Sequence, residues 1–300
     1  MHNARTFSRP QATECSLSDL NCTLHSLVVH PVKSCAGIEL RRSLLLETGL
    51  DLDRAWMVVD EQGEFVTQRE LPRLALIRPT LRSDDMVLRA PGMLALHVAL
   101  DRAESELRVR VWNDWVPAWD RGARAAQWCS DFAGRPLRLV RFDPDYRRLS
   151  DSRWTGAHLG QTAFADGFAL LVTSTASLAG RNRRLQEQGQ PAEEMRRFRP
   201  NLVLDGIEAH DEDHIDLLEI DTPQGTVRLK LVKPCARCSI PGVDPDTGEQ
   251  GFAVTDVLAT YRADARVDGA VTFGMNAIVL GGVEHELAVG QICRASYGFQ

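Results

Sequence analysis

The chain has 300 residues, of which 44% are hydrophobic and 25% are charged, the composition of a globular protein with one large or two average domains. Its 35 basic and 41 acidic side chains leave a net charge of −6, which argues against a protein that works on nucleic acid or on an anionic membrane. A chain of this length can bury a core without help from a metal or a disulfide, so any metal would be functional.

Seven cysteines are scattered along the chain, at positions 15, 22, 35, 129, 235, 238 and 293. An odd, thinly spread set is unlike the disulfide framework of a small secreted protein and indicates a reducing compartment. Residues 1–21 are polar and aperiodic, contain no apolar run of signal-peptide length, and are expected to form a loose tail. The longest uncharged apolar stretch, 167–180, is too short to span a bilayer, so we expect a cytoplasmic protein.

Short runs of leucine and β-branched residues, separated by turn signals, extend from Thr23 to Trp119. Residues 60–63 are typical of a hairpin loop and residues 90–92 of a tight turn. Many short strands at this spacing predict a barrel or a sandwich. The predicted strands are 24–29, 38–46, 55–59, 65–68, 75–80, 86–89, 94–98 and 107–112.

Helical spacing begins at Ala123 and is expected to stop at Gly134, a residue suited to the position after a helix. A strand at 137–142 then leads into 143–166, a segment rich in Asp and Arg that we interpret as a long, functional loop. The remaining predicted elements are strands at 168–172, 202–204, 217–220, 227–232 and 277–280, helices from 176 to about 188 and at 256–261, and a loop at 233–250.

The sharpest motif is the pair Cys235-Ala236-Arg237-Cys238, which is followed by the turn sequence 243–248 (Val-Asp-Pro-Asp-Thr-Gly). Two thiolates at this spacing suit zinc, copper(I), an iron–sulfur cluster or another thiophilic centre, and they can also exchange disulfides. Zinc is disfavoured because no second ligand pair exists: His210 and His214 lie in an acidic loop. Disulfide exchange is disfavoured because the pair does not open a helix after a first βα unit.

Basic and hydroxyl residues recur where predicted strands meet loops, at Lys33-Ser34, at Arg54 and at Arg199-Pro200-Asn201. Guanidinium forks, a lysine charge, hydroxyls and the backbone N–H groups of a helix start are the usual means of holding an anion. Ser174 could cap such a helix start. Any one of these cations alone is expected on a solvated surface, and only their joint occurrence indicates an anion site.

Together with Phe273-Gly274-Met275-Asn276, these motifs resemble MOSC-domain proteins, in the same order, from about residue 23 to the C-terminus. The chain is most similar to the subgroup that has an N-terminal MOSC β-barrel domain and includes the amidoxime-reducing component. The resemblance implies an α+β fold that is mainly β, with an N-terminal β-barrel-like domain over 22–142 and a MOSC β-barrel domain with peripheral helices over 143–300, after the tail at 1–21.

The resemblance also implies a molybdenum cofactor, a pyranopterin whose dithiolene holds the metal, with Cys238 as protein thiolate and catalytic residue and Cys235 as a neighbour. Asn276 falls on the substrate side of the site and is the second expected catalytic residue. The cofactor-binding residues that carry over are Lys33, Ser34, Arg54, Arg199 and Asn201, with Ser174 and Arg237 as weaker candidates.

The implied reaction is reduction of N-hydroxylated compounds, namely hydroxylamines, amidoximes and N-hydroxy nucleobases. We expect a monomer without an iron–sulfur cluster of its own, which takes electrons from a ferredoxin, a cytochrome b5-like protein or a flavin reductase and binds neither nucleic acid nor membrane. Two alternatives stay open: a sulfur carrier or sulfurtransferase that uses a cysteine persulfide, and a non-catalytic cofactor-binding module.

Some conspicuous residues have plainer interpretations. Four arginines outside the motifs are expected on the solvated surface, His30 is expected to be packed or solvated, and the tryptophans are expected to serve packing. The arginines are Arg69, Arg147, Arg148 and Arg153, and four of the tryptophans are Trp112, Trp115, Trp119 and Trp128.

Overall fold

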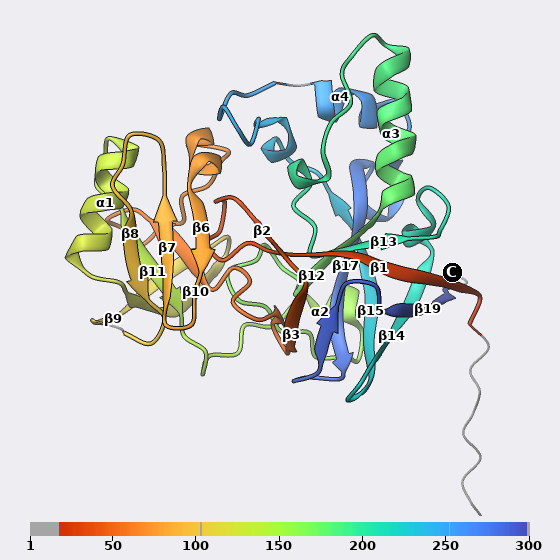
Figure 1. Cartoon of the computed structure of the whole chain (residues 1–300), viewed down its shortest axis with the longest axis horizontal. Helices are drawn as coiled ribbons and strands as arrows, with labels where there is room; N and C mark the ends of the chain where they lie inside the picture. Colours follow the sequence, from red (N-terminus) through yellow and green to blue (C-terminus); the bar gives the residue numbers. More distant parts are fainter. Residues whose placement is uncertain (1–17, 103, 252, 299–300) are drawn as a thin grey trace, which may run out of the picture.

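The computed structural model describes residues 18–102, 104–251 and 253–298. Within these residues the chain forms mostly strands with four α-helices, arranged as two regions side by side (Figure 1). We call residues 51–142 the N-terminal region, and residues 18–50 with 143–298 the barrel region. Of the predicted tail, residues 1–17 lie outside the described residues, and β1 begins already at Leu20.

The barrel region contains a closed barrel in which the strands follow the order β12-β13-β1-β19-β14-β15-β17, and β17 pairs again with β12. Alternate side chains of these strands point inward and form one buried cluster, as the two-residue period of a strand requires. The barrel strands are β1 (Leu20–Val29), β12 (Leu170–Ser174), β13 (Leu202–Asp205), β14 (Ile215–Thr222), β15 (Gly225–Ala236), β17 (Ala270–Gly281) and β19 (Ile292–Tyr297).

Shorter elements complete the barrel region. The parallel strands β12 and β13 are connected through α3 (Thr175–Glu187), which lies with α4 (Ala253–Ala259) at one end of the barrel (Figure 1). The others are α2 (Ser152–Thr155), β2 (Ile38–Leu40), β3 (Arg42–Leu46), β4 (Gly49–Leu50), β16 (Ala263–Asp264), β18 (Glu286–Ala288) and the 3-10 helices Met195–Arg197, Asp211–Asp213, Ile240–Gly242 and Ala265–Val267.

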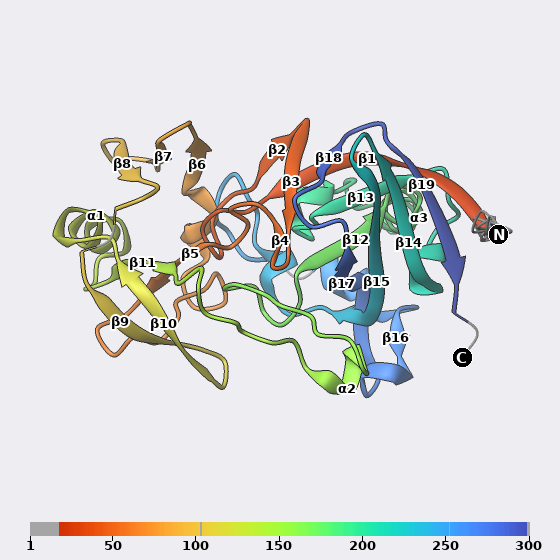
Figure 2. The same ribbon diagram turned by 90° about the horizontal axis from the view of Figure 1, so that it is seen from below.

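Two small antiparallel sheets, one α-helix and one 3-10 helix form the N-terminal region, which Figure 2 shows beside the barrel. Trp56, Leu74 and Phe132 are fully or almost fully buried in its core. One sheet has the order β5 (Trp56–Val59), β11 (Arg138–Phe142), β10 (Asp114–Asp120) and β9 (Glu106–Val111); the other is β6 (Arg78–Leu81), β7 (Asp85–Arg89) and β8 (Leu96–Ala99); the helices are α1 (Ala123–Ala133) and the 3-10 helix Pro72–Leu76.

The expected fold class, mainly β with peripheral helices and a barrel, is confirmed. The helix that was expected to stop at Gly134 does so, with that glycine in the left-handed conformation (φ 72°). The strand β1 pairs with β13 and β19 and therefore belongs to the barrel, although it precedes the N-terminal region in the sequence. The proposed domain boundary at 142/143 stays a prediction.

Several predicted elements are wrong in detail. Residues 65–68 do not form a strand, because the chain turns there and the carbonyl of Thr67 accepts from the N–H groups of Glu70 and Leu71. The first residues of the predicted strand 75–80 lie in the 3-10 helix that Pro72 opens. The strands β10 and β19 were missed, and β15 and β17 are each 12 residues long.

Two further findings concern exposure. Trp128 is 7% exposed and packs in the core, whereas Trp112 and Trp115 are each 43% exposed and lie outside it. Trp112 nevertheless packs against Phe65 and Arg69. No α-helix in the described parts of the chain is both long and apolar enough to cross a membrane.

Candidate functional site

A cavity of about 160 Å³ lies where the N-terminal region meets the start of β12, the residues before β13, the end of β15 and the middle of β17. All predicted site residues except Ser174 line it. They are Lys33, Ser34, Arg54, Arg199, Asn201, Arg237, Cys238 and Asn276, and they come from five separate segments of the chain.

Backbone hydrogen bonds bring the first two segments together. The N–H of Lys33 donates to the carbonyl of Trp56 (2.8 Å), and the N–H of Arg54 donates to the carbonyl of His30 (2.9 Å). Ser34, Arg54 and Arg199 all have left-handed backbones, with φ of 67°, 47° and 57°. Such conformations are uncommon for residues other than glycine and are concentrated at functional sites, and here three of them surround one cavity.

Lys33 is 6% exposed, and its ammonium group has two protein partners. Nζ donates to the carbonyl of Phe164 (2.8 Å) and to the carboxylate of Asp166. Burial lowers the pKa of Lys33, against the opposing effect of Asp166. Since an ammonium has three protons, one donor remains for a ligand.

Arg54 and Arg199 lie next to each other. Arg54 donates to Asp53 (2.5 Å), to the amide oxygen of Asn201 (2.9 Å) and to the carbonyl of Arg199 (3.1 Å). Arg199 donates to the carbonyl of Cys35 (2.6 Å). Burial, and then the charge of Arg54, lower the pKa of Arg199 to about 10. An anionic ligand would relieve this crowding of buried cations.

Asn201, which lines the cavity, also has a structural role. Its amide oxygen accepts from Arg54 and from the N–H of Leu171 (3.1 Å), and its amide nitrogen donates to the carbonyl of Val28 (3.1 Å). These contacts join β1, the start of β12 and the arginine pair. Asn201 therefore positions Arg54, and one of the two N–H groups of its amide is left for a ligand.

The cysteine pair sits at the end of β15, where the ladder with β17 is interrupted by bulges. Arg237 donates to the sulfur of Cys235 (3.0 Å) and to the carbonyl of Phe198 (3.0 Å), and its Nε is buried without a partner in the described part of the chain. The sulfur of Cys238 instead accepts from Nη2 of Arg69 (3.3 Å). The two thiols are therefore held by different arginines.

The turn at 243–248 is structural. One carboxylate oxygen of Asp244 accepts from the N–H groups of Asp246 (2.9 Å) and Thr247 (3.0 Å), and the other accepts from Arg197 (2.8 Å). These bonds clamp the loop after the cysteines against the segment that leads to Arg199.

Ser174 does not line the cavity. Its hydroxyl accepts from the N–H of Ser177 at the start of α3 and donates to the buried carboxylate of Glu212 (3.0 Å). The expectation that it caps a helix is met, but this hydroxyl serves the protein's own structure, so we leave Ser174 out of the site.

Two site residues lie outside the predicted motifs, Arg69 and Asp166. Asp166 interacts with Lys33, with Arg69 (3.3 Å) and with the indole of Trp112 (3.2 Å). Although burial opposes it, Lys33 and Arg69 hold the pKa of this carboxyl well below its usual range. Asp166 lies in the segment 143–166 predicted to be functional, whereas no sequence signal pointed to Arg69.

The surface interpretation of Arg148 is also wrong. Arg148 is 5% exposed and donates to the carbonyls of Ala163 (2.9 Å), Ala165 (2.6 Å) and Asp166 (3.2 Å), so it holds the loop that carries Asp166. Arg147 and Arg153 are exposed, as predicted.

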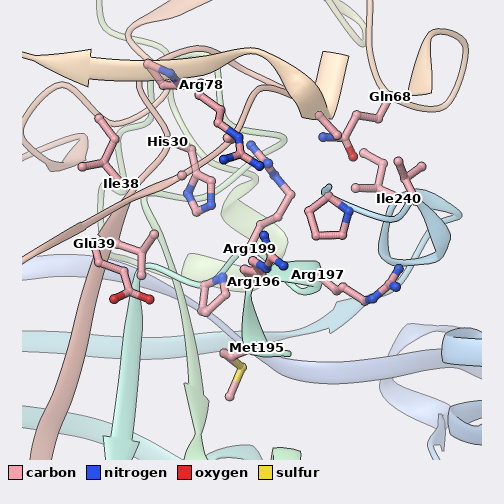
Figure 3. A pocket seen from close by; sticks show the side chains of 18 of the residues that line it. His30, Ile38, Glu39, Gln68, Arg78, Met195, Arg196, Arg197, Arg199 and Ile240 are labelled. Atoms are coloured by element: carbon pink, nitrogen blue, oxygen red, sulfur yellow. The ribbon is translucent and has the colours of Figure 1, made fainter. Parts of the chain in front are cut away.

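A second cavity, of about 380 Å³, shares Arg199 and Ile240 with the first. Figure 3 shows these two side chains among those that line it. Cys238 does not line it, and carboxylates already pair with its arginines Arg78, Arg196 and Arg197. His30 on its wall is 2% exposed, and burial lowers its pKa well below the usual value, as expected for a packed, neutral histidine.

Comparison with known proteins gives two domain matches. Residues 21–136 match the MOSC N-terminal beta barrel domain, and residues 160–293 match the MOSC domain. The chain is 35% identical over 235 residues to mitochondrial amidoxime reducing component 2 of Bos taurus, covering 75% of this chain and 68% of that protein. It is 34% identical over 250 residues to mitochondrial amidoxime-reducing component 1 of Homo sapiens, covering 80% and 72%.

A longer relative matches as well. Molybdenum cofactor sulfurase of Homo sapiens is 30% identical over 267 residues, which are 83% of this chain but only 29% of that protein.

Proposed function

The chain belongs to the family of proteins that join a MOSC N-terminal beta barrel domain to a MOSC domain, and from this premise we propose that it is a molybdenum-cofactor-dependent reductase of N-hydroxylated compounds. The observation that carries the proposal is one cavity that joins a soft thiol, Cys238, to five cationic side chains and a single carboxylate. The cations are Lys33, Arg54, Arg69, Arg199 and Arg237, and the carboxylate is Asp166.

The residues fit such a group. A thiol is the ligand that a metal already bound by sulfur prefers, and Cys238 is partly exposed and not in a disulfide. The surplus of buried positive charge, with the lowered pKa of Arg199 and the unpartnered Nε of Arg237, is what an anionic pterin phosphate would compensate. We propose Cys238 as the metal ligand and Lys33, Ser34, Arg54, Arg199 and Arg237 as contacts to the rest of the cofactor.

When bound, such a cofactor supplies the two-electron chemistry that cleaves an N–O bond. The reaction is R–NHOH + 2 H⁺ + 2 e⁻ → R–NH₂ + H₂O, with the electrons coming from a separate donor protein such as a ferredoxin, a cytochrome b5-like protein or a flavin reductase. Asn276 is fixed at the cavity by donating its amide N–H to the carbonyl of Lys233 (3.2 Å). With the amide nitrogen used in this way, we propose that the amide oxygen of Asn276 accepts a hydrogen bond from the substrate nitrogen.

Asp166 does not act as the proton donor in this scheme. Its carboxyl is held ionised by Lys33 and Arg69, so it keeps these cations in place at neutral pH. The proton on Lys33 Nζ that has no protein acceptor is available to an anion or to the oxygen of the substrate.

The proposal is tested by turnover. Protein produced in a host that makes the cofactor, supplied with electrons from a reduced dye, should convert benzamidoxime to benzamidine, and Asn276→Ala should raise KM or lower kcat. Molybdenum-loaded protein that converts no hydroxylamine, amidoxime or N-hydroxy nucleobase would exclude the reductase and favour a cofactor-binding module.

The sulfurtransferase alternative is favoured by one finding, the match to molybdenum cofactor sulfurase. It predicts a persulfide on Cys238, seen as a 32-dalton mass increase on that cysteine, in protein without tightly bound molybdenum. A molybdenum-loaded protein without persulfide contradicts it.

A further inference from the structure

Arg69 is the residue by which the N-terminal region reaches the sulfur of Cys238. It follows Gln68 in a turn and belongs to none of the motifs, yet its Nη2 lies 3.3 Å from that sulfur. Arg237, which does belong to the motif, contacts Cys235 instead. The proposed metal ligand is thus the one cysteine of the pair that is contacted from the other region.

Two neighbours fix the guanidinium of Arg69. The same Nη2 donates to Asp166 (3.3 Å), and the guanidinium lies over the indole ring of Trp112, 4.8 Å from the ring centre. A nitrogen with two N–H groups can serve a carboxylate and a sulfur at once, and stacking on an aromatic ring restricts its rotation. The arginine is therefore held in the orientation in which it donates a hydrogen bond to Cys238.

The backbone of Trp112 adopts an uncommon conformation. Trp112 is the first of the two loop residues between the paired Val111 and Asp114, and its φ is 57°. A two-residue hairpin connection favours a positive φ at its first residue, a conformation that is uncommon for a bulky side chain. The tip of the hairpin is further fixed by a hydrogen bond from the indole N–H to Asp166 (3.2 Å) and one from Arg110 to the carbonyl of Trp112 (2.8 Å).

We infer that Arg69 is a positioning residue for Cys238, which orients the sulfur and supplies an N–H···S hydrogen bond to it when it serves as a metal ligand. The inference rests on the proposed function, since it concerns the same sulfur. Hydrogen bonds and positive charge at a metal-bound thiolate stabilise the more electron-rich state of the centre and raise its reduction potential. Through Arg69, the N-terminal region thereby adjusts the reduction potential of a metal centre whose protein ligand, Cys238, comes from the barrel region.

The test compares Arg69→Leu and Arg69→Lys with Arg73→Leu in molybdenum-loaded protein. Arg73 is an apt control because its guanidinium also lies over an aromatic ring, that of Phe132 (4.3 Å), away from the cavity. We expect the potential of the metal, measured by redox titration with EPR detection, to fall in Arg69→Leu, to fall less in Arg69→Lys, and to stay at the wild-type value in Arg73→Leu.

Trp112, whose ring stacks on Arg69, gives a second comparison. Trp112→Leu removes the ring beneath the guanidinium and should shift the potential in the same direction by a smaller amount. Trp115→Leu is the matched control, because Trp115 lies on the same hairpin with the same 43% exposure.

The outcomes separate the two claims. A wild-type protein without molybdenum overturns the proposed function, whereas loaded Arg69 variants with the wild-type potential overturn only the role of Arg69. If Arg69→Leu does not retain the metal, Arg69→Lys provides the test. A metal potential equal to the wild-type value in Arg69→Lys contradicts the inference.

Discussion

The two regions contribute to the same cavity in different ways. The barrel region presents Arg237 and Cys238 just after the end of its long strand β15, and Asn276 from the middle of β17. The N-terminal region presents Arg69, from a turn, and supports it with Trp112 at the tip of a hairpin. We propose that the barrel supplies the metal ligand, whereas the N-terminal region contributes Arg54 to cofactor binding and Arg69 to adjusting the ligand. Loss of the ligand should abolish metal binding, and loss of Arg69 should change the properties of the site without emptying it.

The largest effect is expected at the cysteine pair. Cys238→Ser removes the proposed soft ligand, so molybdenum content and turnover should each fall to below about one hundredth of wild type. Cys235→Ser, the matched control, should keep most of both, because its sulfur contacts Arg237 instead. Metal analysis together with dye-coupled turnover gives the answer; a metal-free Cys235→Ser beside a loaded Cys238→Ser would reassign the ligand.

The second prediction concerns the pairing of β12 with β17, which closes the barrel. Gly274 has φ 77°, and a Cβ there would lie 2.6 Å from the carbonyl oxygen of Val172 on β12. Gly274→Ala should therefore lower the free energy of unfolding by about 1–3 kcal/mol. Gly281→Ala on the same strand meets no atom within 4 Å and should change it by less than about 0.5 kcal/mol. Urea denaturation measures both, and equal values would show that the close approach is unimportant.

A third prediction concerns the buried cations of the barrel side. Arg199→Met removes charge-assisted contacts and should weaken cofactor retention by about ten- to a hundredfold. Arg196→Met is the control, because Arg196 is paired with Asp246 and does not line the cavity. Molybdenum lost during dialysis reports retention. If Arg199→Met kept its metal as wild type does, the anion-binding role of Arg199 would be wrong.

The smallest effect is expected at the contact between the regions, where His30 lies beside Asp53. Burial lowers the pKa of His30 well below 6.5, so the unfolded chain binds a proton that the folded chain does not. Stability should therefore fall as pH drops below about 6.5, by at most about 1.4 kcal/mol per pH unit. His30→Phe should flatten this dependence in denaturation curves at pH 7 and pH 5. His25→Phe is the control, because His25 is exposed on β1, the strand that precedes His30.

Much of the site could be predicted because its residues stand in motifs at strand ends. A barrel brings such ends together, so Lys33, Arg199 and Cys238 meet even though they are far apart in the sequence. The lengths of the strands were harder to predict. Glycine and asparagine within β17, and a proline within β10, are unusual in strands, and these two strands are stabilised by pairing with their neighbours.

The remaining site residues could not be predicted because only tertiary placement gives them a role. Arg69 and Arg148 are single arginines without a motif, and composition alone puts such residues on the surface. Ser174 is the opposite case: the sequence pattern correctly predicts that it caps a helix, but the cap and Glu212 use the hydroxyl that the motif offers to a ligand. Motifs thus indicate which groups are chemically special, whereas the fold decides which of them face the cavity.

The measurement that tests the central claim most directly is the molybdenum content of purified protein from a host that makes the cofactor. The account predicts close to one molybdenum per chain in the wild type and in Cys235→Ser, and almost none in Cys238→Ser. A wild-type content far below one per chain, or a fully loaded Cys238→Ser, would contradict it.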